Sequence, residues 1–164
     1  MADSIRKRIT DQLLARLGGD TVTPMPTGLG TVKITKNRTS PISSSDLPSY
    51  SVYFLHNMPK PIGDPRRAVV NQNHLTIEVR IIANGNDDAL DAHDQWVILR
   101  MGTADRLPQS DGSHLTLGIV EGETFFESLE GSQEERTVHR IQWVVEFQSL
   151  RADMTKSQWE VLPK

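Results

Sequence analysis

Apolar and polar residues alternate along Thr137–Phe147, near the end of the chain. The apolar residues that share one face are Ile141, Trp143, Val145 and Phe147. The opposite face is polar except at Val144. Alternation of this kind is typical of a strand in an antiparallel sheet with one covered face. We therefore expect a long closing strand whose apolar face contributes to the core.

A second pattern, with apolar residues three or four positions apart, predicts two helices. The first spans Ser4–Leu17, can be capped by Asp3 or Ser4, and stops at Gly18-Gly19. The second runs from about Asp88 to Met101 and ends at Gly102. Its apolar side faces the core through Leu90, His93, Trp96, Val97 and Met101.

Shorter apolar runs predict the other strands, and together the elements follow the order α-β-β-β-α-β-β. The expected strands are Thr31–Arg38, Tyr50–Leu55, Leu75–Ile81, and the pair Leu115–Val120 and Glu123–Glu127, which can be continuous around Gly122. This order predicts an α+β fold: a mostly antiparallel sheet with two main helices packed on one face.

The segment His56–Asn73 interrupts this regularity. Pro59, Pro61 and Pro65 are expected to break both helix and strand. The segment therefore resembles the extended tip of a hairpin, and tips of this length are usually functional or disordered. We expect it to be mobile in the free protein and ordered in an assembly.

Composition narrows the class of protein. A chain of 164 residues suits one domain, and its net charge of −3 argues against a nucleic-acid binder. It contains no cysteine, which excludes disulfides, cysteine zinc sites and thiol catalysis. No signal-peptide pattern and no apolar run long enough to span a membrane is present in the sequence. The low hydrophobic content of 37% suggests that part of the apolar surface is buried between subunits.

No motif points to chemistry, so we expect no catalytic residue, no cofactor and no metal site. The five histidines lack metal-ligand spacing, and no nucleophile elbow, phosphate loop or dinucleotide fingerprint occurs. The acidic run from Glu121 to Glu135 could in principle hold paired carboxylates for acid–base work. A solvated face is the favoured interpretation, and a surface for a basic partner or an ion is the second.

Several segments together resemble the tail-terminator proteins of long-tailed bacteriophages. They are the helix Ser4–Leu17 with its Arg6-Lys7-Arg8 opening, the stretch Leu47–Tyr53 that leads into a strand, the alternating Leu75–Ile82, the helix Leu90–Met101, and the closing strand with its exit through Leu150-Arg151-Ala152-Asp153. The resemblance implies a structural subunit that forms a ring, a hexamer in that family, at the head-proximal end of the tail tube. Such a ring ends tube polymerisation and provides the surface for head–tail joining.

The resemblance also implies partners and a location. The partners are other copies of the chain, the tail tube protein and a head completion or neck protein; DNA would pass through the ring lumen without sequence-specific binding. The chain would be made in the host bacterial cytoplasm and end in the virion. Residues 1–155 are expected to form one domain, followed by a C-terminal arm at 156–164. The long His56–Asn73 insertion departs from the plainest form of the family pattern.

Candidate interface residues are basic, acidic or apolar groups on expected loops and ends. They are Arg6, Lys7, Arg8, Met58, Ile62, Arg66, Arg67, Glu134, Glu135 and Trp159. Arginine is favoured at interfaces because its planar fork pairs with carboxylates. For the basic residues the competing interpretation is an ordinary solvated surface, and Trp159 could fold back on its own domain or dock on a neighbour.

Two other classes of protein stay open at this stage. One is a neck adaptor or tail-completion protein on the portal side, which shares the same general layout. The other is a small enzyme with an unrecognised carboxylate or histidine site.

Overall fold

The computed structural model describes residues 3–64, 66–85, 87–104, 106–109, 111–129, 136–151 and 155. Within these residues the chain forms two α-helices, five strands and two short 3-10 helices, at Thr27–Leu29 and Ser44–Asp46. In chain order the main elements are α1 (Ile5–Leu17), β1 (Lys33–Lys36), β2 (Ser49–Pro61), β3 (Val70–Asn84), α2 (Asp87–Gly102), β4 (Gly118–Leu129) and β5 (Arg136–Leu150).

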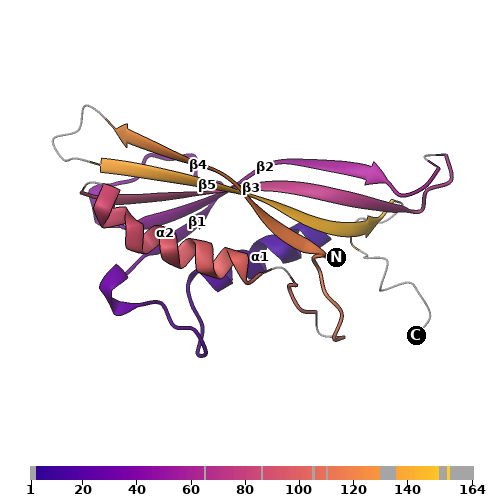
Figure 1. Ribbon diagram of the computed structural model, residues 1–164, viewed down its shortest axis with the longest axis horizontal. Helices are drawn as coiled ribbons and strands as arrows, with labels where there is room; N and C mark the ends of the chain where they lie inside the picture. The colour runs from indigo at the N-terminus through magenta and orange to yellow at the C-terminus, as the bar shows by residue number, and fades with distance from the viewer. Residues whose placement is uncertain are drawn as a thin grey trace.

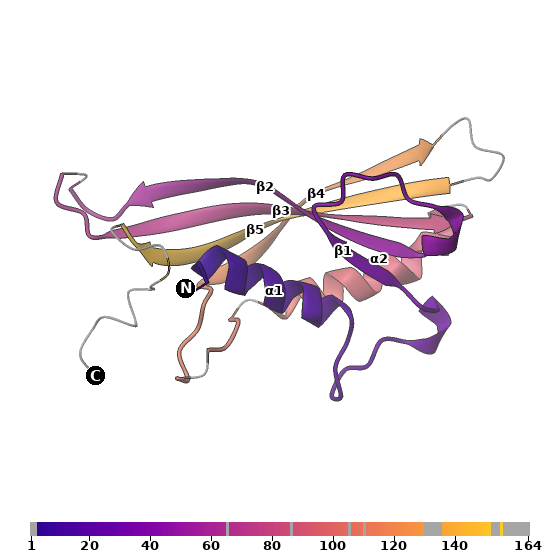
Figure 2. The ribbon, with the colours of Figure 1, turned by 180° about the vertical axis from the view of Figure 1, so that it is seen from behind.

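The strands form one sheet in the order β1-β2-β3-β5-β4. Every neighbouring pair is antiparallel except β1 and β2, which run parallel. Both helices lie on one side of this sheet, as the two opposite views show (Figures 1 and 2). The α+β class, the mostly antiparallel sheet and the element order expected from the sequence are confirmed.

The first helix is favoured both by its capping residues and by an apolar stripe along one face. The Ser4 side chain accepts a hydrogen bond from the Lys7 backbone N–H at 3.2 Å, which satisfies one otherwise unpaired donor. Its buried apolar residues, spaced three or four apart, are Ile5, Ile9, Leu13 and Leu17. Gly18 caps the other end. The face that the sequence predicts is therefore the face that enters the core.

The closing strand β5 lies between β3 and β4, near the middle of the sheet. Its alternation is confirmed, because Ile141, Trp143, Val145 and Phe147 are all buried in the main core. The residues that alternate with them are only partly buried: Arg140, Gln142, Val144 and Glu146. The two faces of this strand therefore separate the helix-covered core from an open, polar side of the sheet.

The expectation that the insertion breaks regular structure is wrong. Strand β2 continues through Pro59 and Pro61, and both pair with β3 opposite Asn73 and Asn71. The Ile62 N–H donates to the Val70 carbonyl at 3.0 Å, so alternation turns the nitrogens of Pro59 and Pro61 to the other edge. Proline is compatible with a strand at such a position because no ladder bond is lost.

Residues 56–73, which we call the arm, thus form most of a hairpin. Its start coincides with a shift in the β2–β3 register between Phe54 and His56. The parallel partner β1 reaches only as far as Val52, so it does not accompany the arm. The arm extends past both helices to one end of the molecule (Figures 1 and 2). We call the helix-covered remainder of the fold the body.

Two arginines join the C-terminal ends of the helices. Arg16 on α1 donates to the Arg100 carbonyl at 2.9 Å, and Arg100 on α2 donates to the Arg16 carbonyl at 2.8 Å. Arg100 is buried and also pairs with Asp20 at 2.7 Å. Cations are favourable at helix C-termini, where carbonyls are left without intrahelical partners. This exchange fixes the two helices against each other.

Candidate assembly surfaces

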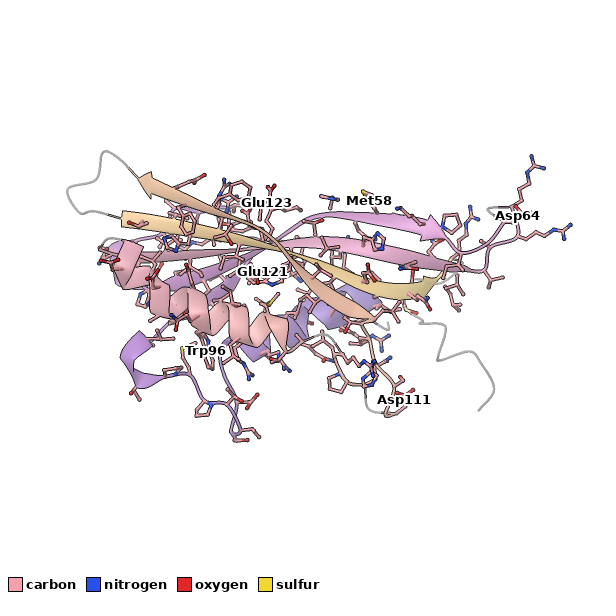
Figure 3. All side chains as sticks on the ribbon, viewed as in Figure 1. Met58, Asp64, Trp96, Asp111, Glu121 and Glu123 are labelled. Atoms are coloured by element: carbon pink, nitrogen blue, oxygen red, sulfur yellow. The ribbon has the colours of Figure 1, made fainter. Side chains whose placement is uncertain are left out.

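The outer part of the arm exposes apolar side chains on an ordered backbone. Met58, Ile62 and Val69 have exposed fractions of 48%, 44% and 67%. The turn at its tip is held by Asp64, whose carboxylate accepts the Arg66 N–H at 3.0 Å and whose carbonyl accepts the Arg67 N–H at 2.9 Å. Figure 3 places Met58 along the arm and Asp64 at its outer end. The arm therefore presents a shaped apolar surface to its surroundings.

The same arm carries a cluster of cations. Lys60, Arg66 and Arg67 are exposed, and among the described residues none of the three forms an ion pair. Asp64 is the one described carboxylate between residues 56 and 73. The tip is consequently net basic in a chain that is acidic overall. Two predicted interface groups, the Met58–Ile62 pair and the Arg66–Arg67 pair, thus come together on one projecting element.

Strand β4 forms the edge of the sheet opposite β1, and its middle stretch, residues 120–123, is exposed. It pairs with β5 on one side, and no described strand lies on its other side. Val120 and Phe126 have exposed fractions of 60% and 63%. Glu121 and Glu123 are also exposed, and neither pairs with a cation of the described residues (Figure 3). The β4 edge is therefore apolar and acidic where the arm is apolar and basic.

The expected continuity around Gly122 is confirmed, because β4 runs unbroken through it. The register with β5 shifts between Glu121 and Thr124, so the strand carries a bulge there. A Cβ at Gly122 would come within 3.2 Å of the Gln142 carbonyl oxygen, a close approach that only glycine allows without movement. The bulge shapes the stretch of edge that carries Glu121 and Glu123.

On the face of the sheet opposite the helices, charged and polar side chains pair with one another. Glu78 is buried there and accepts hydrogen bonds from Arg80 at 2.7 Å and Gln142 at 3.0 Å. Burial favours the neutral acid, but these two hydrogen bonds and the nearby Arg140 charge outweigh it and lower the pKa of Glu78. Arg140 in turn pairs with Glu127 at 2.6 Å. These pairs within one copy keep this face polar and fix the positions of its side chains.

The basic residues of α1 play different parts. Lys7 forms ion pairs with Asp11 at 2.7 Å and with Asp3 at 3.0 Å, and its hydrogen bonds to these two carboxylates raise the pKa of the lysine. Arg8 donates to the Gln109 side chain at 3.1 Å and to the Thr155 carbonyl at 3.0 Å. Arg6 is exposed. Arg8 therefore tethers the loop before β4 and the start of the C-terminal segment to α1.

Two histidines form buried pairs beneath α2. The Tyr50 hydroxyl lies 2.8 Å from Nδ1 of His93, and Nδ1 of His139 lies 2.6 Å from the Asp94 carboxylate. Burial lowers the pKa of His93 and raises that of Tyr50. Phe126 packs edge-on against the His139 ring, with centroids 4.7 Å apart. Both imidazoles are almost inaccessible to solvent, so these pairs anchor α2 to the sheet.

Within the described residues, no group of three or more acidic, histidine or cysteine side chains is arranged to hold a metal ion. None of the described helices has the length and apolar character needed to cross a bilayer.

Three predicted interface residues, Glu134, Glu135 and Trp159, lie outside the described residues. Conversely, sequence reasoning missed the exposed apolar side chains Val120 and Phe126 of β4. Their signal is faint, because apolar residues in a short strand are ordinarily assigned to the core. What sets them apart is that β4 is an edge strand, which depends on the order of the strands in the sheet.

Comparison with known proteins gives a likeness of fold. No family model matches the chain, and no curated protein matches its sequence. Among the solved structures with a similar fold is a chain in the virion of a native gene transfer agent particle, with a TM-score of 0.51 and 14% sequence identity. The match covers 82% of this chain and 91% of that chain, so the two share the fold over nearly their whole length.

Proposed function

We propose that this chain is a structural protein of a phage-like virion, and that it forms a ring at the head-proximal end of the tail tube. The observation that carries the virion assignment is the likeness of fold to a chain of a gene transfer agent virion over 82% of this chain. The sequence resemblance to tail terminators adds the finer role. In that role the ring stops tube polymerisation and offers a surface for head–tail joining.

The distribution of exposed groups supports a ring. The arm and the β4 edge belong to different parts of the sheet, and each exposes apolar side chains together with one sign of charge. Contacts between unlike surfaces repeat head to tail, and they give a closed ring when the rotation closes. A closed ring of this kind suits a virion subunit whose assembly must stop at a fixed number of copies.

The partners follow from the same proposal. Besides its own copies, the ring would contact the tail tube protein on one side and a head completion or neck protein on the other. Met58, Ile62, Arg66 and Arg67 on the arm, Arg6 and Lys7 on α1, and Glu134, Glu135 and Trp159 are candidate contact residues. DNA would pass through the lumen without sequence-specific contacts.

Mass photometry of the full chain, with and without assembled tail tubes, tests the proposal. We expect a closed oligomer, a hexamer, either free or on the tube end, and a ring in negative-stain images. A dodecamer would instead favour the portal-side adaptor. A protein that stays monomeric in both conditions, and that does not bind tube ends, would contradict any ring-forming role.

A further inference from the structure

We infer that, within the ring, the arm of each copy lies against the β4 edge of the next copy. The inference rests on the proposed ring and names the two surfaces that form it. The arm is part of β2 and β3, whereas β4 closes the other edge of the sheet beyond β5. When these two different surfaces meet in a head-to-tail contact, the contact repeats in one direction around a closed ring.

Charge complementarity selects the β4 edge as the partner of the arm. Lys60, Arg66 and Arg67 leave the arm with a basic surface, and these cations have no carboxylate partner among the described residues. On β4, Glu121 and Glu123 are exposed and are likewise without a described cation. Opposite charges that are each unpaired within one copy can pair between two copies, which fixes the register of the contact.

The apolar residues agree with this assignment. Met58, Ile62 and Val69 on the arm and Val120 and Phe126 on β4 are among the large hydrophobic side chains that the structure leaves exposed. Residues 70–73 of the arm pair with β5, but the turn beyond them has little apolar support of its own. Contact between the two surfaces would remove apolar area from water on both copies and would support the arm.

The prolines limit how the contact is made. Pro59 and Pro61 turn their nitrogens to the outer edge of β2, so this edge cannot donate a regular ladder of hydrogen bonds. The arm therefore meets β4 through side chains and its basic tip, and does not add a strand to the neighbouring sheet.

Cysteine cross-linking tests the contact directly, because the chain contains no cysteine. Three exposed valines provide a matched set: Val69 on the arm, Val120 on β4, and Val22, which is 89% exposed in the turn after α1. The full-length Val69→Cys/Val120→Cys variant, treated with a short bis-maleimide, should give a ladder of covalent oligomers up to the size of the ring. The Val69→Cys/Val22→Cys variant and the single variants should give at most a small fraction of that ladder.

Charge reversal provides a second, independent measurement. Arg66→Glu/Arg67→Glu should weaken self-association about tenfold, and adding Glu121→Lys/Glu123→Lys should restore most of it. Asp91→Lys, which reverses an exposed carboxylate on α2, is the control and should leave the oligomer unchanged.

The outcomes separate this inference from the ring itself. An oligomer that forms normally, but gives equal ladders with Val22→Cys and Val120→Cys, overturns the arm–β4 contact and leaves the ring intact. Failure of the lysine changes on β4 to rescue the reversed arm has the same consequence. Absence of any oligomer with the unmodified chain overturns the ring and the contact together.

Discussion

The body and the arm use the same hairpin strands for opposite purposes. In the body, Val52, Ile77 and Val79 are buried beneath the helices. A few residues farther along the same strands, the arm exposes Met58 and Ile62 and has no helix beside it (Figure 1). Apolar residues in the first region stabilise the fold of one copy, whereas in the second they are available to a neighbour. Apolar residues of the same two strands therefore stabilise the core beneath the helices and form an exposed surface beyond them.

The largest difference between the regions is expected in stability. Trp143 is almost fully buried beneath the helices, so Trp143→Ala should lower the free energy of unfolding by about 3–5 kcal/mol. Met58→Ala on the arm should change it by less than about 0.5 kcal/mol. Urea unfolding followed by circular dichroism measures both. Comparable losses would mean that the arm belongs to the cooperative core, contrary to the distinction drawn between the two regions.

The arginines that join the helices give the next largest effect. Arg100→Met removes charged hydrogen bonds to the Arg16 carbonyl and to Asp20, and should cost about 2–3 kcal/mol. Hydrogen bonds from the Thr23 backbone and then from Arg100 lower the pKa of Asp20 to about 2, so the substitution should raise this pKa part of the way to its usual value. NMR titration of the carboxylate and urea unfolding test the two parts. Arg67→Met on the arm is the control, and a similar loss of stability there would contradict the prediction.

A pH effect should be confined to the body. Because burial lowers the pKa of His93, the unfolded chain binds a proton below about pH 6.5 that the native chain does not, and stability should fall as the pH drops. One such proton accounts for at most about 1.4 kcal/mol per pH unit. Thermal unfolding between pH 7.5 and 5.5 should show a smaller slope in His93→Asn than in the unmodified protein. Above pH 4.5 the lowered pKa of Glu78 adds little to this slope. Equal slopes in the two proteins would remove His93 as the cause.

Shortening the arm should have a small effect on stability and a complete effect on assembly. Lys60 pairs with Gln72, so residues 61–71 can be replaced by an Asn-Gly turn that keeps the register of the remaining hairpin. The free energy of unfolding should change by less than about 1 kcal/mol, because no buried apolar side chain is removed. Mass photometry should show that oligomers are lost. Normal assembly of the shortened chain would contradict an assembly role for the arm.

The parts of the fold that the sequence predicts correctly are those with a local signal. The alternation in β5 and the stripe of α1 each reflect burial on one face of a single element, and both are confirmed. The arm was correctly predicted to be the end of a hairpin, but its strands were missed because the effect of Pro59 and Pro61 depends on which edge of β2 their nitrogens face. That edge is defined by the order of strands, which no local pattern in the sequence reveals.

Contacts between residues far apart in the sequence also could not be predicted. Arg8 was predicted to lie at an interface or on a solvated surface, yet it bonds within the chain to Gln109 and Thr155, which are 101 and 147 positions away. The reciprocal pairing of Arg16 with Arg100 likewise depends on helix ends that meet only in the folded chain. Of the candidate surfaces, the sequence indicated the arm through its charge and apolar residues, whereas the exposed edge formed by β4 could be found only from the strand order.

The two prolines of the arm also bear on how separate copies of the chain behave in solution. A projecting hairpin with a bare outer edge is an ordinary starting point for fibrils, because another extended chain can add to it without limit. With Pro59 and Pro61 at that edge, a second arm that paired there would meet no backbone N–H donor at these two alternate positions. We therefore expect Pro59 and Pro61 to oppose aggregation of free copies through the arm, the element that the proposed assembly requires to stay exposed.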